Sequence, residues 1–567
     1  MRLQSVIIPD ENKYNKLYYR GNQALSAGET LTFDTYFNGF CYTKYREYTT
    51  VENVRFSCEF SGSARIELCV FDGQEHIISS GEYNKTADIP FSLSALPEFG
   101  FLYPKITALT ECELRSGEYI SDCEPMAISC CIAICTYKRE NYVLKNIAKL
   151  RKYKFSVINK VFVIDNGKTL DSQVLTDAFI NVLPNKNYGG CGGFTRGLIE
   201  AHDGNYSHVI LMDDDVELHP ETLEQMTVFV SLLKPAYSNS WFSTGMLPLD
   251  NPFCQFELGS EWDGKRAIVH KHNVDILDQN VLLDNLNNPD VEYGGWWTLL
   301  MPVSVTENGL PYPFFIKFDD VEYALRKSAS TQIITMNGIA VMHEAFDRKK
   351  SFVLEYYNLR NELAVNAIHG KYGTMGAVKR FLYEIVKHMC LYRYDNIPLV
   401  MRAVNDFLDG PDFFLNCDEE SYNQNLIETT PKLIPLNNIP EWNEQLRCDY
   451  HQLDKRITPV MILTLGGHII PSFLLKNEIS AVPLSRTGAV DCFMKKSVIQ
   501  YQLGGNTGLV VHRSFMKFMK YSMLSAGIAF KLLFRFSKVK KQLCKHSTEI
   551  SSFDFWKNHL NTQINSL

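Results

Sequence analysis

The amino-acid sequence predicts an α/β protein: a central domain with a parallel sheet, an N-terminal β-sandwich and a helical C-terminal region. Residues 1–125 alternate polar with apolar or aromatic residues between turn residues, as in "NVRFSCEFSG", which is typical of sandwich strands. Residues 126–370 alternate continuous apolar runs with stretches of helical period, which indicates a parallel sheet. In residues 371–567 the apolar residues recur mostly at helical spacing. These three ranges are the predicted domains.

The composition is that of a folded globular protein. A chain of 567 residues is too long for one ordinary core, and 45% hydrophobic residues with a net charge of −7 exclude a protein that coats nucleic acid. The first residues, "MRLQSVIIPDENKYNKLYYR", lack the pattern of a secretory signal, and no apolar run reaches the roughly 18 residues of a membrane-spanning helix. We therefore expect a cytoplasmic protein with no nucleic-acid partner.

Fifteen cysteines are scattered along the chain. Cys130, Cys131 and Cys135 lie within the apolar run "MAISCCIAICT", at a spacing that matches no zinc-ligand pattern. Free cysteines are among the most often buried residues. The sequence therefore favours buried reduced thiols over metal ligands or disulfides.

The central domain begins with "AISCCIAICT", an apolar run suited to a strand buried on both faces, and "RENYVLKNIAKLRKY" follows as a helix. "KVFVIDNG" and "INVLP" are the next strands. "GGCGGFTRGLIEAH" is a glycine-rich turn entering a helix, "HVILMDDDVEL" is a strand, and Pro220 begins another helix. Later, "GGWWTLLMP" and "TQIITM" are strands, "PFFIKFDDVEYALRKSAS" enters a helix, and "FVLEYYNLRNELAVNAIHG" is a long helix ending at Gly370. Parallel strands place their carboxyl ends, the usual position of a site, at one edge.

Three aspartates, Asp213, Asp214 and Asp215, end the strand "HVILM". A solvated turn that caps the next helix is one explanation. Against it, adjacent like charges raise one another's proton affinity unless a cation compensates, and hard divalent ions take such oxygen ligands. Because side chains alternate along an extended segment, Asp213 and Asp215 point one way and Asp214 the other. We therefore predict a metal or nucleotide site here.

The turn "NKNYGGCGGFTRG" is not a dinucleotide fingerprint, because such glycines would directly follow the first strand, and here that strand leads into "CTYKREN". A glycine-rich helix start can still admit a phosphate or a sugar closely, since no Cβ obstructs its backbone amides. Alone, this signal is weak.

Asp319 and Asp320 in "FIKFDDVEYALR" come at the start of a predicted helix. Helix capping explains one acid better than two, and a carboxylate near an acceptor hydroxyl could take its proton as a general base. His343 follows an apolar segment in "VMHEAF". A lone histidine is more often structural, but an imidazole is also a suitable third ligand beside Asp213 and Asp215.

These motifs, in this order, resemble the inverting glycosyltransferases of family 2, which use nucleotide sugars and have the Rossmann-like GT-A fold. "PNKNYGGCGGFTRG", "ILMDDDVEL", "YGGWWTLLMP", "PFFIKFDDVEYALR", "VMHEAF" and "YYNLRNELAV" are similar to the bacterial galactofuranosyltransferases that polymerise cell-wall galactan. The resemblance is specific between about residues 127 and 370 and extends in layout to both ends. It implies transfer of galactofuranose from UDP-galactofuranose to a glycan or lipid-linked glycan acceptor.

The resemblance implies a metal centre and a base. Asp213, Asp215 and His343 would bind Mn²⁺ or Mg²⁺, and the metal would hold the diphosphate of UDP. Asp320 would remove the proton from an acceptor hydroxyl as that oxygen attacks the anomeric carbon opposite UDP, so the configuration inverts.

Other matching positions would contact the substrates. The residues implied for the donor nucleotide are Arg139, Asn187, Asp213 and Asp214. Those implied for the sugar and acceptor are Trp296, Trp297, Lys317 and Asp319. Core packing explains the tryptophan pair equally well.

Two positions depart from the family pattern: Phe318 stands where the family has tryptophan, and Asn358 where it has histidine. Both concern acceptor recognition, so the reaction is implied more firmly than the sugar. One alternative is a family 2 transferase for another donor, rhamnosyl or pyranosyl. Another is an inactive glycan-binding scaffold, against which the intact aspartates and His343 argue.

The tail from Ser514 mixes Phe, Met and Leu with lysines and Arg535. Such a basic amphipathic stretch can lie on an anionic membrane surface, here the inner face of the cell membrane, or pack on the protein with a solvated basic face. The sequence favours neither. A homo-oligomer is also compatible with it.

Overall fold

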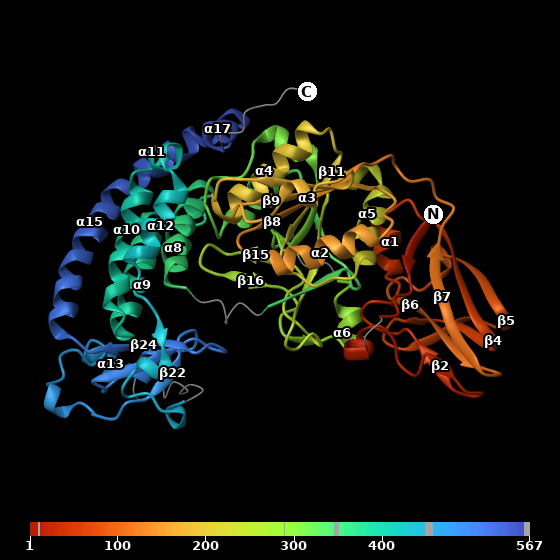
Figure 1. Ribbon diagram of the computed structural model, residues 1–567, viewed down its shortest axis with the longest axis horizontal. Coiled ribbons are helices and arrows are strands. Elements are labelled where there is room, and N and C mark those ends of the chain that lie inside the picture. Colours follow the sequence, from red (N-terminus) through yellow and green to blue (C-terminus); the bar gives the residue numbers. More distant parts are fainter. Residues whose placement is uncertain (10–11, 288–289, 345–350, 448–457, 561–567) are drawn as a thin grey trace. The chain divides into compact units, whose positions relative to one another are not determined.

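The computed structural model describes residues 1–9, 12–287, 290–344, 351–447 and 458–560 (Figure 1). The chain divides into two compact units. The first comprises Met1–Pro311 and Asp320–Glu344, and the second Tyr312–Asp319 and Ala345–Leu567. The predicted domain boundaries at residues 125 and 370 stay predictions.

The N-terminal part of the first unit is a seven-stranded antiparallel sheet in the order β1-β7-β4-β6-β3, with β2 beside β7 and β5 beside β4. The all-β prediction is confirmed, and the strands form one hydrogen-bonded sheet. Along β4 every second side chain from Val54 to Phe60 is buried, which is the period of a strand with one face on a core. The strands are β1 Arg2–Ser5, β2 Ala24–Leu25, β3 Thr30–Thr32, β4 Asn53–Phe71, β5 Glu75–Ser92, β6 Phe101–Ala108 and β7 Cys112–Ile120. Helix α1 spans Tyr42–Tyr48.

A second seven-stranded sheet, in the order β10-β9-β8-β11-β18-β12-β19, forms the centre of the first unit. Its strands β10, β9, β8 and β11 are parallel, as predicted, whereas β18 runs antiparallel to β11. The strands are β8 Cys130–Thr136, β9 Ile158–Asp165, β10 Ile180–Pro184, β11 His208–Asp213, β12 Trp241–Ser243, β18 Thr298–Pro302 and β19 Ile333–Ile334. The helices are α2 Glu140–Lys152, α3 Ser172–Leu175, α4 Gly189–Asp203 and α5 Pro220–Ser231.

Several local signals in this sheet behave as the sequence predicts. Pro220 lies in the first turn of α5, where its missing N–H costs nothing, and the His219 Nδ1 accepts from the Glu221 amide at 3.2 Å. Cys130 and Cys131 are fully buried in β8. No disulfide joins the cysteines that the structure describes.

Smaller elements complete the first unit. Strand β13, Gly245–Pro248, pairs in parallel with β20, Ala340–His343, which carries His343. Two short pairs are β14 Cys254–Gln255 with β17 Val274–Asp275, and β15 Ser260–Trp262 with β16 Ala267–Val269. Helix α6 spans Gln279–Asp284, and α7 begins at the acidic pair and spans Asp319–Lys327.

The second unit is mainly helical, which confirms the prediction for the C-terminal region, and Figure 1 shows α15 running along its neighbours. Helix α15 packs on α8, α9 and α10. The helices are α8 Phe352–Ile368, α9 Thr374–Cys390, α10 Ile397–Leu408, α11 Pro411–Asn416, α12 Glu419–Thr429, α13 Thr458–Leu463, α14 Ala489–Cys492, α15 Phe515–Lys545, α16 Ser547–Ile550 and α17 Phe553–His559.

The second unit also contains a four-stranded sheet, in the order β21-β24-β23-β22, which the sequence analysis did not predict. The strands are β21 Ile434–Pro435, β22 Ala481–Pro483, β23 Ser497–Tyr501 and β24 Thr507–His512. In the described part of the chain, no helix combines the length and apolar character needed to cross a bilayer.

Candidate functional site

The three consecutive aspartates lie at the carboxyl end of β11. The strand is buried from His208 to Met212, and its last residue, Asp213, is in register with Cys135 of the parallel strand β8. The Asp213 amide donates to the Trp297 carbonyl at 3.0 Å. Asp213 is half-buried, whereas Asp214 and Asp215 are buried. An apolar strand therefore delivers three carboxylates to the edge of the sheet where sites usually form.

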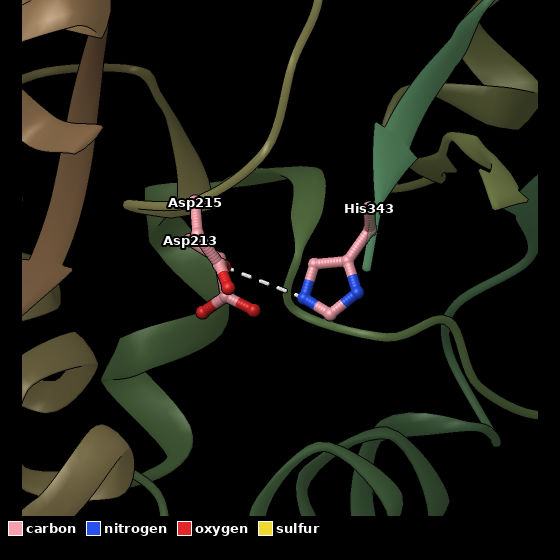
Figure 2. A group of neighbouring side chains, drawn as sticks. All are labelled: Asp213, Asp215 and His343. Carbon is pink, nitrogen blue, oxygen red and sulfur yellow. Dashed lines mark ion pairs between the residues drawn. The ribbon is translucent and has the colours of Figure 1, made fainter. Parts of the chain in front are cut away.

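Asp213, Asp215 and His343 form the candidate metal centre (Figure 2). One possible ligand atom from each of these residues lies within 4.8 Å of the others. The His343 Nε2 is 3.3 Å from Oδ1 of Asp215. Its Nδ1 is 2.7 Å from the Glu344 carbonyl oxygen, which only accepts, so Nδ1 carries a hydrogen and Nε2 is the ring nitrogen that faces the carboxylates. Two carboxylates and one imidazole fit Mn²⁺ or Mg²⁺.

Backbone hydrogen bonds hold the two strands of the metal centre together. The Glu217 amide donates to the Met342 carbonyl at 2.8 Å, and the Met342 amide returns a bond to Glu217 at 2.7 Å. Glu217 lies two residues after Asp215, and Met342 directly precedes His343. This reciprocal pair fixes the imidazole beside the carboxylates, although the two segments are far apart in the sequence.

Arg139 compensates the negative charge of the aspartates. Its Nη1 lies 2.5 Å from Oδ2 of Asp215 and 3.4 Å from Oδ1 of Asp214. Burial alone would lower the pKa of Arg139, but the two carboxylates outweigh it and raise the pKa above its ordinary value. A permanent cation thus lies beside the candidate metal centre.

Asp214 braces the turn. Its Oδ2 accepts from the Thr136 hydroxyl at 2.7 Å, and the Asn146 amide donates to its backbone carbonyl at 2.9 Å and to that of Val216 at 3.1 Å. Burial raises the pKa of Asp214, an effect that Thr136 and Arg139 partly offset. Asp214 is not part of the metal trio, and it shares the Nη1 of Arg139 with Asp215. Its predicted contact with the nucleotide stays a prediction.

The glycine-rich turn is explained largely by packing. A Cβ on Gly193 would lie 2.2 Å from Sγ of Cys135, and one on Gly197 would lie 2.4 Å from Cβ of Ala133. These glycines therefore let α4 approach β8 closely. The side-chain oxygen of Asn187 accepts from the Gly189 amide at 3.2 Å, at the start of α4. Whether Asn187 also contacts a nucleotide stays a prediction.

Asp320 lies in the first turn of α7 and is half-buried. Its Oδ1 accepts from the Val321 amide at 2.8 Å. Asp320 belongs to the first unit with the metal trio, whereas Lys317 and Asp319 belong to the segment Tyr312–Asp319 of the second. The predicted roles of all three stay predictions.

Sequence reasoning missed Glu257, a buried acid whose pKa is raised in part by the charge of Asp320. Burial raises its pKa to about 8, and the negative charge of Asp320 adds to this effect. Glu257 is 5% exposed and therefore protonated at neutral pH. It lies in a long polar segment without period, where the only signal was an acid between Phe256 and Leu258 in "FELG".

Trp296 and Trp297 directly precede β18 and are both buried. The Trp296 ring packs edge-on against Phe194, with centroids 5.5 Å apart, and against Tyr323 at 6.1 Å. Core packing therefore accounts for much of this side chain. Among the described residues, its buried Nε1–H has no hydrogen-bond partner, which is unusual for a buried donor. The predicted contacts of both tryptophans with sugar and acceptor stay predictions.

Comparison with known proteins places two family models on the chain. Residues 5–122 match "Galactofuranosyltransferase 2 N-terminal", and residues 131–231 match "Glycosyl transferase family 2", a range that includes the three aspartates. The predicted resemblance is confirmed.

Two curated proteins called galactofuranosyltransferase GlfT2 are similar to the chain. The one from Mycolicibacterium smegmatis is 24% identical over 431 residues, which are 67% of this chain and 64% of that protein. The one from Mycobacterium tuberculosis is 26% identical over 443 residues, 71% of this chain and 69% of that protein. The chain thus spans just under two thirds of the M. smegmatis relative.

One similar solved structure is mannosyltransferase PcManGT from Pyrobaculum calidifontis in complex with GDP-Man and Mn²⁺. The matched region is 54% of this chain and 87% of the mannosyltransferase chain. The two chains are 11% identical, with a TM-score of 0.29.

Proposed function

We propose that the chain is an inverting, metal-dependent galactofuranosyltransferase of glycosyltransferase family 2, since its residues 5–122 and 131–231 match the galactofuranosyltransferase 2 N-terminal and glycosyl transferase family 2 models. Its proposed donor is UDP-galactofuranose, and its proposed acceptor a glycan or lipid-linked glycan in the synthesis of a cell-surface polysaccharide. The observation that carries the proposal is the cluster of Asp213, Asp215 and His343, within the unit that contains both matched regions.

The metal trio and Arg139 would bind the donor. Asp213, Asp215 and His343 would hold Mn²⁺ or Mg²⁺, and a bound ion supplies positive charge beside the diphosphate that leaves. Arg139 adds a second cation on the same side, and Asn187 and Asp214 complete the proposed nucleotide contacts. The buried tryptophans, with Lys317 and Asp319, are the proposed contacts of sugar and acceptor.

Asp320 is the proposed general base. It takes the proton of an acceptor hydroxyl while that oxygen forms a bond to the anomeric carbon, and the bond from that carbon to UDP breaks on the opposite face. The configuration therefore inverts, the proton rests on Asp320, and the electron pair leaves with UDP. Glu257 supports this role, because a neutral acid near Asp320 adds no second negative charge.

Donor turnover tests the proposal. The full chain is incubated with acceptor and a panel of UDP- and dTDP-sugars, with Mn²⁺ or with EDTA, and nucleotide release is measured. We expect release from UDP-galactofuranose only with the metal. Release from a UDP-pyranose or from dTDP-rhamnose instead would reassign the donor, and no metal-dependent release from any donor would indicate a glycan-binding scaffold.

We also propose that α15 contacts the inner face of the cell membrane. One face of the helix, from Tyr521 to Leu543, is buried in the second unit. On the remaining surface Met516, Met523, Phe530 and Phe534 are between 64% and 77% exposed. The helix has eight basic and no acidic residues, and interleaved lysines and large apolar groups suit an anionic lipid surface better than a protein interface, which is depleted in lysine. A homo-oligomer stays a prediction.

A further inference from the structure

The backbone that leads into the acidic pair is strained. Phe315, Lys317 and Phe318 have φ values of 67°, 70° and 68°. The left-handed region holds only a few per cent of residues other than glycine, and bulky side chains there are outliers. Such conformations persist only where the surroundings impose them, and they cluster at functional sites. What holds this segment therefore has a direct bearing on the two aspartates that follow.

The side chain of Asn361 in the second unit contacts three backbone carbonyls of the segment. The Asn361 amide nitrogen of α8 lies 3.1 Å from the Phe314 carbonyl oxygen, 3.0 Å from that of Ile316 and 2.8 Å from that of Lys317. Within the segment, the Ile316 amide bonds only two residues back, to Phe314 at 2.9 Å, as in a γ-turn. A hydrogen bond this local does not by itself select the backbone path, whereas Asn361 ties three of the carbonyls together.

Arg360 fixes the orientation of Asn361. Its Nε donates to the Asn361 Oδ1 at 2.9 Å, which turns the amide nitrogen toward the segment, and its Nη2 donates to the Phe314 carbonyl at 2.9 Å. The guanidinium is itself locked in place, 5.2 to 5.4 Å from the ring centroids of Tyr356, Tyr357, Phe413 and Phe414. Arg360 and Asn361 are fully buried, so water does not compete for these bonds.

We propose that Asn361, oriented by Arg360, is a positioning residue for the acidic pair. It holds the segment in which Phe315, Lys317 and Phe318 have positive φ, and thereby the direction in which Asp319 and Asp320 leave that segment. The inference rests on the proposed function in taking Asp320 as the base. We call the contacts of Asn361 with the carbonyls of Phe314, Ile316 and Lys317 the clamp. A base whose carboxylate is displaced by about 1 Å from the acceptor oxygen works on the order of 100-fold more slowly. The clamp therefore acts on turnover rather than on donor binding.

Asn361→Ala tests the clamp, with Asn366→Ala as the matched control. Asn366 is a fully buried asparagine of the same helix, and its side chain interacts with Tyr372. We expect Asn361→Ala to lower kcat about 100-fold with less than a twofold change in the Kd of UDP with Mn²⁺, and Asn366→Ala to leave kcat within about threefold. Equal losses of kcat in the two variants, or a parallel loss of UDP affinity, would overturn the inference.

Glycine at position 317 supplies a rescue experiment. Glycine adopts positive φ readily, so it should need the clamp less than alanine, and comparing Lys317→Gly with Lys317→Ala cancels the loss of the lysine side chain. We expect the two to differ by less than about twofold in kcat when Asn361 is present. Combined with Asn361→Ala, the glycine variant should be about tenfold faster than the alanine variant. Equal kcat values for the two double variants would contradict the inference.

Hydrogen exchange separates this inference from the proposed function. In the full chain, Asn361→Ala should accelerate amide exchange in residues 312–319 at least about tenfold relative to Asn366→Ala, because the backbone loses its restraint. This measurement needs no turnover. If the unmodified protein turns over no donor, the proposed function fails and the clamp is judged by exchange alone. If exchange is unchanged, the clamp fails even in an active enzyme.

Discussion

The His343 Nε2 lies 3.3 Å from Oδ1 of Asp215, while its Nδ1 is committed to the Glu344 carbonyl. Nε2 is therefore the ring nitrogen that would bind a metal held by the aspartates. Arg139 contacts the other oxygen of the same carboxylate at 2.5 Å, so Asp215 joins the candidate metal centre to the cation proposed to meet the diphosphate.

Loss of the imidazole should abolish metal binding with little effect on folding. We expect His343→Ala to weaken Mn²⁺ binding more than about 100-fold, since even the hydrogen-bond partners of metal ligands contribute about 10- to 100-fold. Calorimetric titration of Mn²⁺ measures this. His219→Gln, which changes a half-buried histidine outside the trio, is the control. Mn²⁺ affinity that survives in His343→Ala would exclude the imidazole as a ligand.

Replacing the proposed base should lower only kcat, whereas replacing a metal ligand should also weaken UDP binding. Asp320→Asn removes the proton acceptor but keeps the shape, so kcat should fall about 10²- to 10⁴-fold while the Kd of UDP with Mn²⁺ stays within about twofold. Asp215→Ala should weaken both, because it removes a metal ligand and a partner of Arg139. Steady-state rates and UDP titrations of the two variants measure the difference. Normal turnover in Asp320→Asn would show that another group is the base.

Much of the catalytic domain could be predicted because its signals are local. The apolar run of β11 followed by Asp213 identifies a buried strand and its functional end without tertiary information. His343 could be placed beside Asp215 only by resemblance, since their approach depends on the backbone bonds between Glu217 and Met342. Glu257 was missed because a long polar segment has no period to locate a buried position.

The four-stranded sheet of the second unit escaped prediction for a different reason. Strands β21 and β22 are only two and three residues long, which is too short for an alternating pattern to appear. The restraint of Phe314–Lys317 by Asn361 was also beyond sequence reasoning. Positive φ at phenylalanine and lysine contradicts their local preference and is imposed by a helix distant in sequence.

Glu257 should make stability depend on pH. In the folded state it keeps its proton up to about pH 8, whereas the unfolded chain releases it near pH 4 to 5. Between these values the folded state binds more protons, so this group lowers the free energy of unfolding as pH rises, by about 1 kcal/mol per pH unit.

Glu257→Gln should remove this slope. Unfolding by denaturant at pH 5, 6, 7 and 8 measures it, and Glu261→Gln, which alters a half-exposed glutamate of β15, is the control. We expect the glutamine variant to gain stability relative to the unmodified protein as the pH rises from 5 to 8. A constant difference across that range would mean that Glu257 does not stay protonated in the folded state.

Gly197 should be required for packing rather than for ligand binding. An alanine there would bring its Cβ to 2.4 Å from Cβ of Ala133, so we expect Gly197→Ala to lower the free energy of unfolding by about 1 to 3 kcal/mol. At Gly190 the nearest atom to an added Cβ is Cε2 of Phe194 at 4.0 Å, so Gly190→Ala should not destabilise. Thermal unfolding of both variants measures this, and equal stability would remove the packing explanation.

The exposed face of α15 should determine membrane binding. Replacing Met516, Met523, Phe530 and Phe534 by serine removes apolar area from the exposed surface, so the fold should stay intact while the affinity for anionic vesicles falls at least about tenfold. Sedimentation with phosphatidylglycerol vesicles measures this, with neutral phosphatidylcholine vesicles as the comparison. The matched control replaces Ile77 and Ile78, exposed apolar residues of β5 in the other unit, by serine. Because the basic residues act through charge, binding should also weaken as salt rises. If the α15 variant and the β5 variant bound anionic vesicles equally well, the exposed apolar face of α15 would not be a lipid-binding surface.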